Sequence, residues 1–537
     1  MGTVQGSYAS SAWTNRTIFQ FQGIPYAKSP TAQLRFQPPI KTTSWLGTLD
    51  ATKPGIHCPQ ITEEYVNIDN EDCLSLSVFS NNISATQPVM VFIHGGWFIF
   101  GGASEYSPEY LLEMNIVLVV IQYRLGPLGF LSTLSDQIPG NVGILDIIAA
   151  LEWVQQNIEA FGGNSSSVTI FGESAGSAAV SALLHTPLMR SRPLPLFHRA
   201  ILQSGSIFSP WAMCDTPVIG AYDIAKRLGC AEEYYERCLQ TASIENLLKA
   251  FDSHRRDMII QHGYQNVAGA SVVVGGPSGL FPEHPSHYLS QASDRISLMG
   301  GVTSQDGLFL LDEICALQAI KPESLNSFYD LLEFVRLLHG KFGHNQPNGA
   351  PEGYELLEHF STSELNQIRW EDIVLGLTDI CGNHGIKGPT LVDIQAFYRV
   401  NPDGVYLYTF DYSNLLTHMN STIYFPYEAA VHHAADLYYL FPWNTLNNEG
   451  DIKMVKIMTQ LWTSFASSGV PQAELVPYWS PVHKLFGPYF MINEKSEQKE
   501  NFLDEFTATT RRFRNTGQAN KHSKAFLIIA FLVISAI

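Results

Sequence analysis

A serine between two glycines is the first residue whose surroundings indicate chemistry. Residues 172–176 read Gly-Glu-Ser-Ala-Gly, directly after the apolar run 168–171 and before the helix-compatible stretch 177–180. A strand that turns sharply into a helix exposes a serine hydroxyl at the helix N-terminus, and this strained turn accepts only small neighbours. The pattern predicts that Ser174 is a nucleophile; the alternative is an ordinary serine in a glycine-rich turn.

A pair of glycines follows an earlier apolar run. Residues 89–93 read Val-Met-Val-Phe-Ile, and residues 94–98 read His-Gly-Gly-Trp-Phe. Glycines directly after a buried strand indicate that the backbone approaches another group closely. Trp97, with the bulkiest side chain, follows the pair at once. A group that binds to this loop would therefore share its space with an indole ring.

Short apolar runs rich in β-branched residues recur along the chain, as in parallel strands that are buried on both faces. Helical patterns lie between them, and the clearest covers residues 141–160 and ends in Phe-Gly-Gly. This alternation predicts an α/β fold with a central, mostly parallel sheet, whose sites lie beyond the carboxyl ends of the strands. The predicted strands cover residues 89–93, 116–121, 168–171, 200–202, 296–299 and 405–410.

The composition of the 537-residue chain is that of a globular protein, with 45% hydrophobic and 15% charged residues. No linker, low-complexity tract or repeat divides it, which favours one large domain over several. The net charge of −18 repels nucleic acid, so we expect no nucleic-acid partner. The same charge either attracts cationic ligands or simply keeps the protein soluble, and solubility is the favoured interpretation.

The segment around Ser174, FGESAG, resembles the nucleophile motif of the type-B carboxylesterase/cholinesterase-like family of α/β-hydrolases. Other blocks similar to that family extend the resemblance over about residues 2–513. It implies a single large α/β-hydrolase domain at 1–513, with a central, mostly parallel twisted sheet flanked by helices. The blocks are FQGIPYAKSP at 21–30, LRFQPP at 34–39, EDCLSLSVF at 71–79, YRLGPLGF at 123–130, GNVGILD at 140–146, LEWVQQNIEAFGGN at 151–164 and LQSGS at 202–206.

A serine nucleophile needs a base, and the base needs an orienting acid; in this fold they follow in the chain order Ser, acid, His. The resemblance places the acid at Asp306 in GVTSQDG, where the family more often has glutamate, and an unrelated loop acid is the alternative. It places the base at His433 in AVHHAADLYYLF, with Ala430 in place of the usual glycine. His432 is the adjacent competitor, and the motif register favours His433.

The resemblance also implies a role for the glycine pair after the apolar run 89–93. In this fold, backbone N–H groups of the loop and of the residue after the nucleophile hold the oxyanion of the tetrahedral intermediate. By match, the donors are Gly96, Trp97 and Ala175. Two outcomes are open for Trp97. Its ring swings aside and narrows the acyl pocket, or the loop shifts and loses a donor, at a cost of about 10² to 10³ in rate.

The chain has 7 cysteines, so at least one is unpaired within it. The close pairs Cys58/Cys73 and Cys230/Cys238 suit local disulfides in an oxidising compartment, and both resemble disulfides of the family. Two ion pairs resemble structural pairs of the family, namely Arg35 with Glu71 and Arg124 with Asp146.

The substrate is less well indicated than the reaction. Cholinesterases carry a tryptophan in the first disulfide loop, where its face holds a quaternary ammonium; residues 58–73 contain none. Juvenile hormone esterases have glutamine before the nucleophile, where this chain has Glu173. We therefore expect a small-molecule carboxylic ester as substrate, with no cofactor and no metal. The oligomeric state is not indicated.

Both ends of the chain bear on localisation. Residues 1–3 lead into polar sequence without the apolar core of a signal peptide. Either the start is missing from this chain or the protein is cytosolic, and the other end of the chain favours a missing start. The apolar tail 525–537 is shorter than the ~20 residues of a spanning helix and follows a polar spacer at 514–524. This pattern is typical of a GPI-anchor signal; a weakly anchoring extension is the alternative. Sequons for glycosylation, which agree with a secreted protein, occur at Asn15, Asn82, Asn164 and Asn420.

Two functions of different classes compete. The first is a serine esterase that works through an acyl-enzyme, with Ser174, His433 and Asp306. The second is a catalytically impaired adhesion or binding protein at the cell surface, similar to neuroligins, glutactin and neurotactin. Catalytically impaired members of the family usually lack a residue of the triad. All three positions are filled here, which favours the serine esterase over the binding protein. A lipase for long-chain glycerides is a third option without a feature in its favour.

Overall fold

The structure of the protein is a computed structural model. It describes residues 2–61, 66–67, 70–262, 266–317, 370–413, 430–444, 446 and 448–514.

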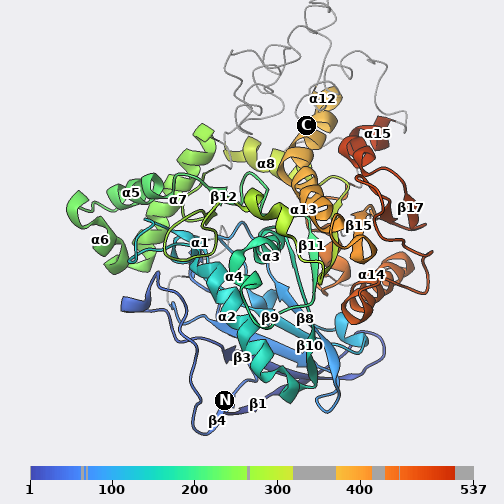
Figure 1. Ribbon diagram of the computed structural model, residues 1–537, viewed down its shortest axis with the longest axis horizontal. Coiled ribbons are helices and arrows are strands. Elements are labelled where there is room, and N and C mark those ends of the chain that lie inside the picture. Colours follow the sequence, from blue (N-terminus) through green and yellow to red (C-terminus); the bar gives the residue numbers. More distant parts are fainter. Residues whose placement is uncertain are drawn as a thin grey trace, which may run out of the picture.

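A large mixed sheet forms the centre of the molecule (Figure 1). Its strand order is β17-β16-β15-β14-β11-β10-β8-β9-β7-β3-β2. The strands from β16 to β9 in this order pair in parallel, and the outer pairs are antiparallel. The strands are β2 (Ser7–Ser10), β3 (Thr17–Pro25), β7 (Ser75–Ser80), β8 (Gln87–Ile93), β9 (Val117–Ile121), β10 (Gly163–Glu173), β11 (Arg199–Gln203), β14 (Ser297–Thr303), β15 (Val405–Phe410), β16 (Tyr489–Ile492) and β17 (Glu497–Lys499).

Three short two-stranded ribbons lie apart from this sheet. They pair β1 (Thr3–Gln5) with β4 (Thr48–Asp50), β5 (Gln60–Ile61) with β6 (Val66–Asn67), and β12 (Met213–Cys214) with β13 (Val272–Val273).

The central strands contain long apolar runs because both of their faces are buried. In β8, Val89, Val91 and Ile93 belong to one core cluster, whereas Met90 and Phe92 belong to a second. Successive side chains of a strand point to opposite faces, so the two clusters lie on opposite sides of the sheet. A continuous apolar run is therefore what this position in the fold requires.

Helices cover both faces of the sheet. Side chains of α2, α3 and α13 belong to the first cluster, and those of α14 to the second. In Figure 1, α5, α6 and α7 gather on one side of the molecule, and α14 and α15 lie on the other. The α-helices are α1 (Gly126–Phe130), α2 (Val142–Asn157), α3 (Ala175–His185), α4 (Pro187–Arg190), α5 (Pro217–Arg227), α6 (Tyr235–Thr241), α7 (Ile244–His262), α8 (Gly307–Leu317), α12 (Trp370–Gly382), α13 (Gly388–Tyr398), α14 (Glu449–Ser468) and α15 (Ala508–Arg514).

The predicted α/β architecture is confirmed, and each of the six predicted strands lies in the sheet. The predicted helix 141–160 is α2 followed by a 3₁₀ turn, Ile158–Phe161, which closes at Gly162 with a positive φ of 81°. The division at 513 and the roles of spacer and tail stay predictions, because residues 515–537 lie outside the described part. Across the described ranges, no helix has both the length and the apolar character needed to cross a bilayer.

Both predicted disulfides are present, Cys58–Cys73 and Cys230–Cys238. The remaining cysteines, Cys214, Cys315 and Cys381, are buried as thiols.

Both predicted ion pairs are present as well. Arg124 and Asp146 form a two-pronged pair with N–O distances of 2.8 and 2.7 Å, and both side chains are buried. Arg35 binds Glu71 in the same way, at 2.8 and 2.6 Å. Two parallel hydrogen bonds fix geometry as well as charge, so each pair locks the loop that carries its arginine.

We expect Asp146→Asn to lower the free energy of unfolding by about 3–5 kcal/mol, because it leaves the buried charge of Arg124 uncompensated. Urea unfolding would measure the change. Lys41→Met is the control, because Lys41 is 56% exposed in its pair with Glu152 and should contribute less than about 1 kcal/mol. Similar losses in the two variants would contradict a structural role for the buried pair.

Candidate active site

Ser174 occupies a strained turn between β10 and α3. Its φ of 57° and ψ of −123° lie outside the regions that non-glycine residues favour. Its neighbours show why small residues surround it. A Cβ on Gly176 would lie 2.0 Å from the carbonyl oxygen of Ile93, and one on Gly205 would lie 2.2 Å from that of Ser174. The turn is therefore pressed against the end of β8 and the loop after β11.

Asp306 and His433 come together beside this turn. Asp306 lies between β14 and α8, and its Oδ1 is 2.7 Å from Nδ1 of His433. Its Oδ2 accepts hydrogen bonds of 2.8 Å from the Ser204 hydroxyl and from the backbone N–H of Thr303. With every carboxylate oxygen occupied, Asp306 holds the imidazole with Nδ1 as the donor. Asp306 is thus no solvated loop acid, since it is fully buried.

His432, the adjacent competitor, points elsewhere. Its Nδ1 lies 2.5 Å from the backbone oxygen of His433, and its ring meets that of Tyr438 edge to face. Between these two histidines, the structure joins His433 to Asp306.

The sequence reasoning missed a contact between Glu173 and His433. Its Oε1 lies 3.0 Å from Nε2 of His433, the nitrogen that would have to reach Ser174. Within the described residues, Nε2 has no hydrogen-bond partner of suitable angle. The available sequence signal is the motif itself, because the residue before the serine in G-x-S-x-G lies in the same turn.

Burial and charge act in opposite directions on this group of side chains. Burial lowers the pKa of His433, but the charge of Glu173 and the hydrogen bond to Asp306 outweigh it and raise the pKa to about 9. Burial raises the pKa of Glu173 to about 8, although the charge of His433 opposes this shift. The resting pair therefore retains a proton near neutral pH.

A third buried carboxyl group, Asp436, faces the same imidazole. Its Oδ2 accepts a 2.8 Å hydrogen bond from Nε2 of Gln203 and a 3.3 Å bond from the Tyr408 hydroxyl. Burial raises its pKa to about 6. Asp436 closes the sequence block of His433, and its contact with Gln203 ties that block to the end of β11.

The loop after β8 is held close to Ser174. A Cβ on Gly95 would lie 2.7 Å from the backbone oxygen of Glu173. The φ values of Gly96, Trp97 and Phe98 are 98°, 56° and 59°, so two residues with side chains take a left-handed conformation. Such residues cost about 1–3 kcal/mol each. The neighbouring structure compensates, since the N–H of Gly126 donates to the Phe98 oxygen at 2.6 Å.

His94 supports this loop as a neutral ring. It is fully buried and stacks on Tyr123 at 4.5 Å, and burial lowers its pKa to about 4.

The ring of Trp97 packs into an aromatic wall. Its centroid lies 5.4 Å from those of Trp211 and Phe309, and Phe309 in turn stacks on His433 at 5.0 Å. Trp97, Phe309 and Phe251 line a cavity of about 430 Å³. This volume lies within the ~300–1,000 Å³ range of small-molecule sites. The indole is therefore one wall of this cavity, whose lining includes neither Ser174 nor His433, and Phe309 connects the cavity wall to the imidazole.

The predicted glycosylation sites differ in accessibility. Asn15 and Asn82 are exposed and Asn164 is half-buried. Asn420 lies outside the described residues. Glycan attachment at all four positions stays a prediction.

A serine turn at the carboxyl end of a central parallel strand, in a sheet covered by helices on both faces, defines an α/β-hydrolase. The model of the carboxylesterase family matches residues 1–509. The chain belongs to this family, which places it among the carboxylic ester hydrolases.

Relatives agree with this assignment. The chain is 30% identical to esterase FE4 of Myzus persicae, over 93% of this chain and 88% of that protein. It is 31% identical to the bile salt-activated lipase of Rattus norvegicus, over 90% and 80%. It is 28% identical to glutactin of Drosophila melanogaster over 92% of this chain, but spans only about half, 49%, of that protein's length.

We expect Glu173→Gln to move the acid limb of the pH profile of kcat/KM to lower pH. The imidazole must be unprotonated to act as a base, and loss of the Glu173 charge lowers the pKa of His433. The profile for p-nitrophenyl acetate across neutral and alkaline pH measures the shift. Glu159→Gln, which changes an exposed carboxylate, is the control. An acid limb at the same pH in both variants would show that Glu173 does not act on His433.

Proposed function

We propose that the protein hydrolyses carboxylic esters through an acyl-enzyme, with Ser174 as nucleophile, His433 as base and Asp306 as orienting acid. The observation that carries the proposal is the 2.7 Å contact between His433 and Asp306 beside the strained turn of Ser174. Membership of the carboxylesterase family supports it.

The first half of the reaction forms the acyl-enzyme. Oγ of Ser174 attacks the ester carbonyl carbon while its proton passes to Nε2 of His433. The tetrahedral intermediate then collapses, and the imidazolium gives this proton to the departing alcohol. Water repeats the sequence on the acyl-enzyme and releases the carboxylic acid.

Nε2 must leave Glu173 and face Ser174 during this cycle. In the resting structure it lies 3.0 Å from Oε1 of Glu173. Asp306 holds only Nδ1, so the ring can tilt about this hydrogen bond. Glu173 is then a positioning residue, which stabilises the imidazolium when the proton has left the serine.

The oxyanion donors in this proposal are the backbone N–H groups of Gly96, Trp97 and Ala175. Ala175 is the first residue of α3, where N–H groups have no partner within the helix. The close approach of Gly95 to the backbone oxygen of Glu173 supports the proposal that the other two donors, which follow Gly95, serve the same turn. The packing of the Trp97 ring against Trp211 and Phe309 supports the first of the two outcomes, a narrowed acyl pocket.

A small-molecule ester with a short acyl group suits this arrangement. The relatives' names include esterases, a juvenile hormone esterase and a lipase. The likeness to glutactin keeps the impaired binding protein as the second candidate, and the left-handed backbone at Trp97 favours it.

We propose that the protein is secreted or extracellular. Its two disulfides suit an oxidising compartment, and one relative is a venom carboxylesterase of Apis mellifera. A glycolipid anchor at 525–537 would keep it at the cell surface and stays part of this proposal.

We expect Ser174→Ala to abolish hydrolysis of p-nitrophenyl acetate, with a loss on the order of 10⁶ in kcat, because no other group forms the acyl-enzyme. Ser44→Ala, at an exposed serine outside the glycosylation sequons, should retain the parent rate. Turnover that persists at the parent rate in Ser174→Ala would contradict the proposed nucleophile. A folded parent without turnover would favour the binding protein.

We expect Trp97→Gly to raise kcat/KM for p-nitrophenyl butyrate more than for the acetate, because it removes a wall of the acyl space and the strain of a side chain at positive φ. The ratio of the two constants is the measurement. Trp45→Gly, outside the aromatic wall, is the control and should leave the ratio unchanged. An unchanged ratio in Trp97→Gly would contradict the narrowed pocket.

A further inference from the structure

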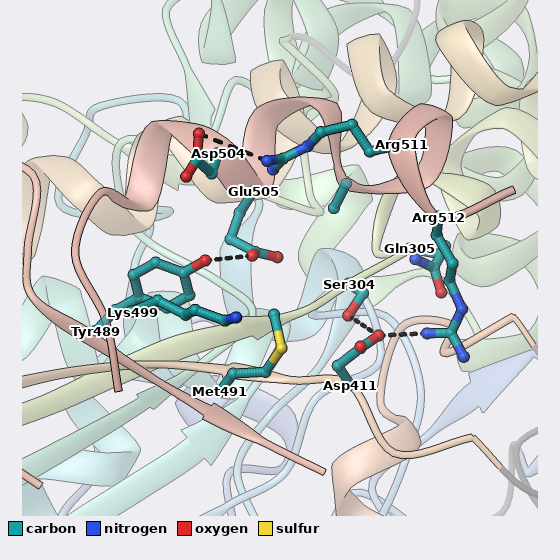
Figure 2. A pocket seen from close by; sticks show the side chains of 11 residues that line it. Ser304, Gln305, Asp411, Tyr489, Met491, Lys499, Asp504, Glu505, Arg511 and Arg512 are labelled. Atoms are coloured by element: carbon teal, nitrogen blue, oxygen red, sulfur yellow. Dashed lines mark hydrogen bonds and ion pairs between the residues drawn. The ribbon is translucent and has the colours of Figure 1, made fainter. Parts of the chain in front are cut away.

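A second cavity lies behind the loop that carries Asp306. It has a volume of about 430 Å³ and opens between that loop, the strands β16 and β17, and α15 (Figure 2). We call it the C-terminal pocket. Its inner wall includes Ser304 and Gln305, which directly precede Asp306. It is thus separate from the cavity next to Trp97, which is lined by a different set of residues.

Gln305 brings an unused donor to this pocket. The side chain is 1% exposed, and its Oε1 accepts a 2.8 Å hydrogen bond from the N–H of Val431. Its Nε2 has no partner among the described residues. A buried amide nitrogen without a partner costs about 1–3 kcal/mol, so this atom is suited to a ligand that accepts a hydrogen bond.

Glu505 supplies a second unused group. It is 2% exposed, and one of its oxygens accepts a 2.6 Å hydrogen bond from the Tyr489 hydroxyl. The other oxygen has no partner in the described part of the chain, and Figure 2 shows it turned away from Tyr489 toward the middle of the pocket. Burial raises the pKa of Glu505, which favours the protonated carboxyl group, a donor.

Cationic side chains add further donors at the rim. Lys499 binds Glu497 through one contact of 2.6 Å, and Arg511 lies 3.5 Å from Asp504. An ammonium has three donors and a guanidinium five, so each keeps donors for another group. The acidic residue Asp411 has fewer acceptor positions left for a ligand, since it already accepts from Ser304 and Arg512.

The remaining lining is apolar. Met491 and the ring of Tyr489 face the same space as Lys499 (Figure 2). A volume of about 430 Å³ matches the ~300–1,000 Å³ typical of pockets for small organic molecules. An occupant therefore combines acceptor oxygens with an organic body.

We propose that the C-terminal pocket binds a small organic carboxylate, whose oxygens accept from Gln305, Lys499 and Arg511 and whose apolar part packs on Met491. Charge-assisted hydrogen bonds are the strong ones, and they select a carboxylate over a neutral analogue of the same shape. This proposal does not depend on the proposed esterase mechanism.

The wall of the pocket is connected to the segments that carry the acid–histidine pair. The backbone N–H of Gln305 donates to the oxygen of Val431 at 3.0 Å, and its side chain accepts from the N–H of the same residue. Gln305 is next to Asp306, and Val431 is two residues before His433. Lys387 connects the loop that carries Ser304 to the segment that carries Glu505. Its Nζ donates to the backbone oxygens of these two residues at 2.8 and 2.7 Å.

The test is a binding titration of the full chain with 4-fluorobenzoate, followed by ¹⁹F NMR, with 4-fluorobenzamide as the neutral probe. We expect saturable binding of the carboxylate and much weaker binding of the amide. Lys499→Met and Lys499→Met/Arg511→Met should each weaken binding by about tenfold or more. Both residues are well exposed, so thermal unfolding should show that the variants remain folded.

Lys484→Met is the matched control. Lys484 is an exposed lysine paired with Glu500 and lies outside the lining, so this variant carries the same change in charge and should bind as the parent does. Parent-like binding in the double variant would place the probe elsewhere, for instance at Ser174, and would overturn the proposal. Equal binding of the amide, or no binding of the carboxylate, would overturn it as well.

Discussion

The contact between Nδ1 of His433 and Oδ1 of Asp306 is the interaction on which the rest of the site depends. An imidazole buried among carboxyl groups is more stable when other groups satisfy the acids, since unpaired buried charges are costly. Ser204 and the backbone at Thr303 do this for Asp306, and Gln203 satisfies one oxygen, Oδ2, of Asp436. The loops after β11 and β14 are thereby joined to the loop of His433 through one ring.

Much of the fold could be predicted because the signals are local. Apolar runs predicted six strands of the central sheet, since a strand buried on both faces has to be apolar throughout. The strained turn at Ser174 was predicted for a similar reason, because its glycines lie within the same few residues. The two disulfides followed from close spacing together with the family resemblance. The histidine choice also came from motif register, and the structure joins His433 to Asp306.

The contacts that sequence reasoning missed are those made across long separations. The G-x-S-x-G motif places Glu173 in the serine turn, but it does not show that the carboxyl group reaches an imidazole 260 positions later. The sequence also gives no sign that Nε2 of Gln305 lacks a partner among the described residues, because this depends on how the loop before α8 packs in the folded protein. Burial, which raises the pKa of Glu173, and the neighbouring charges, which raise the pKa of His433 against its burial, are properties of the assembled molecule and not of a motif.

The tight backbone contacts at Gly176 and Gly205 have a consequence for how such a protein can diverge. Any side chain at these positions would overlap a carbonyl oxygen. Substitution of either glycine would therefore disrupt the serine turn. The aromatic wall of Trp97, Trp211 and Phe309 carries no such constraint, because ring contacts near 5.4 Å can be remade with other side chains. Substitutions in this aromatic wall can therefore change the substrate preference while the residues of the serine turn stay the same.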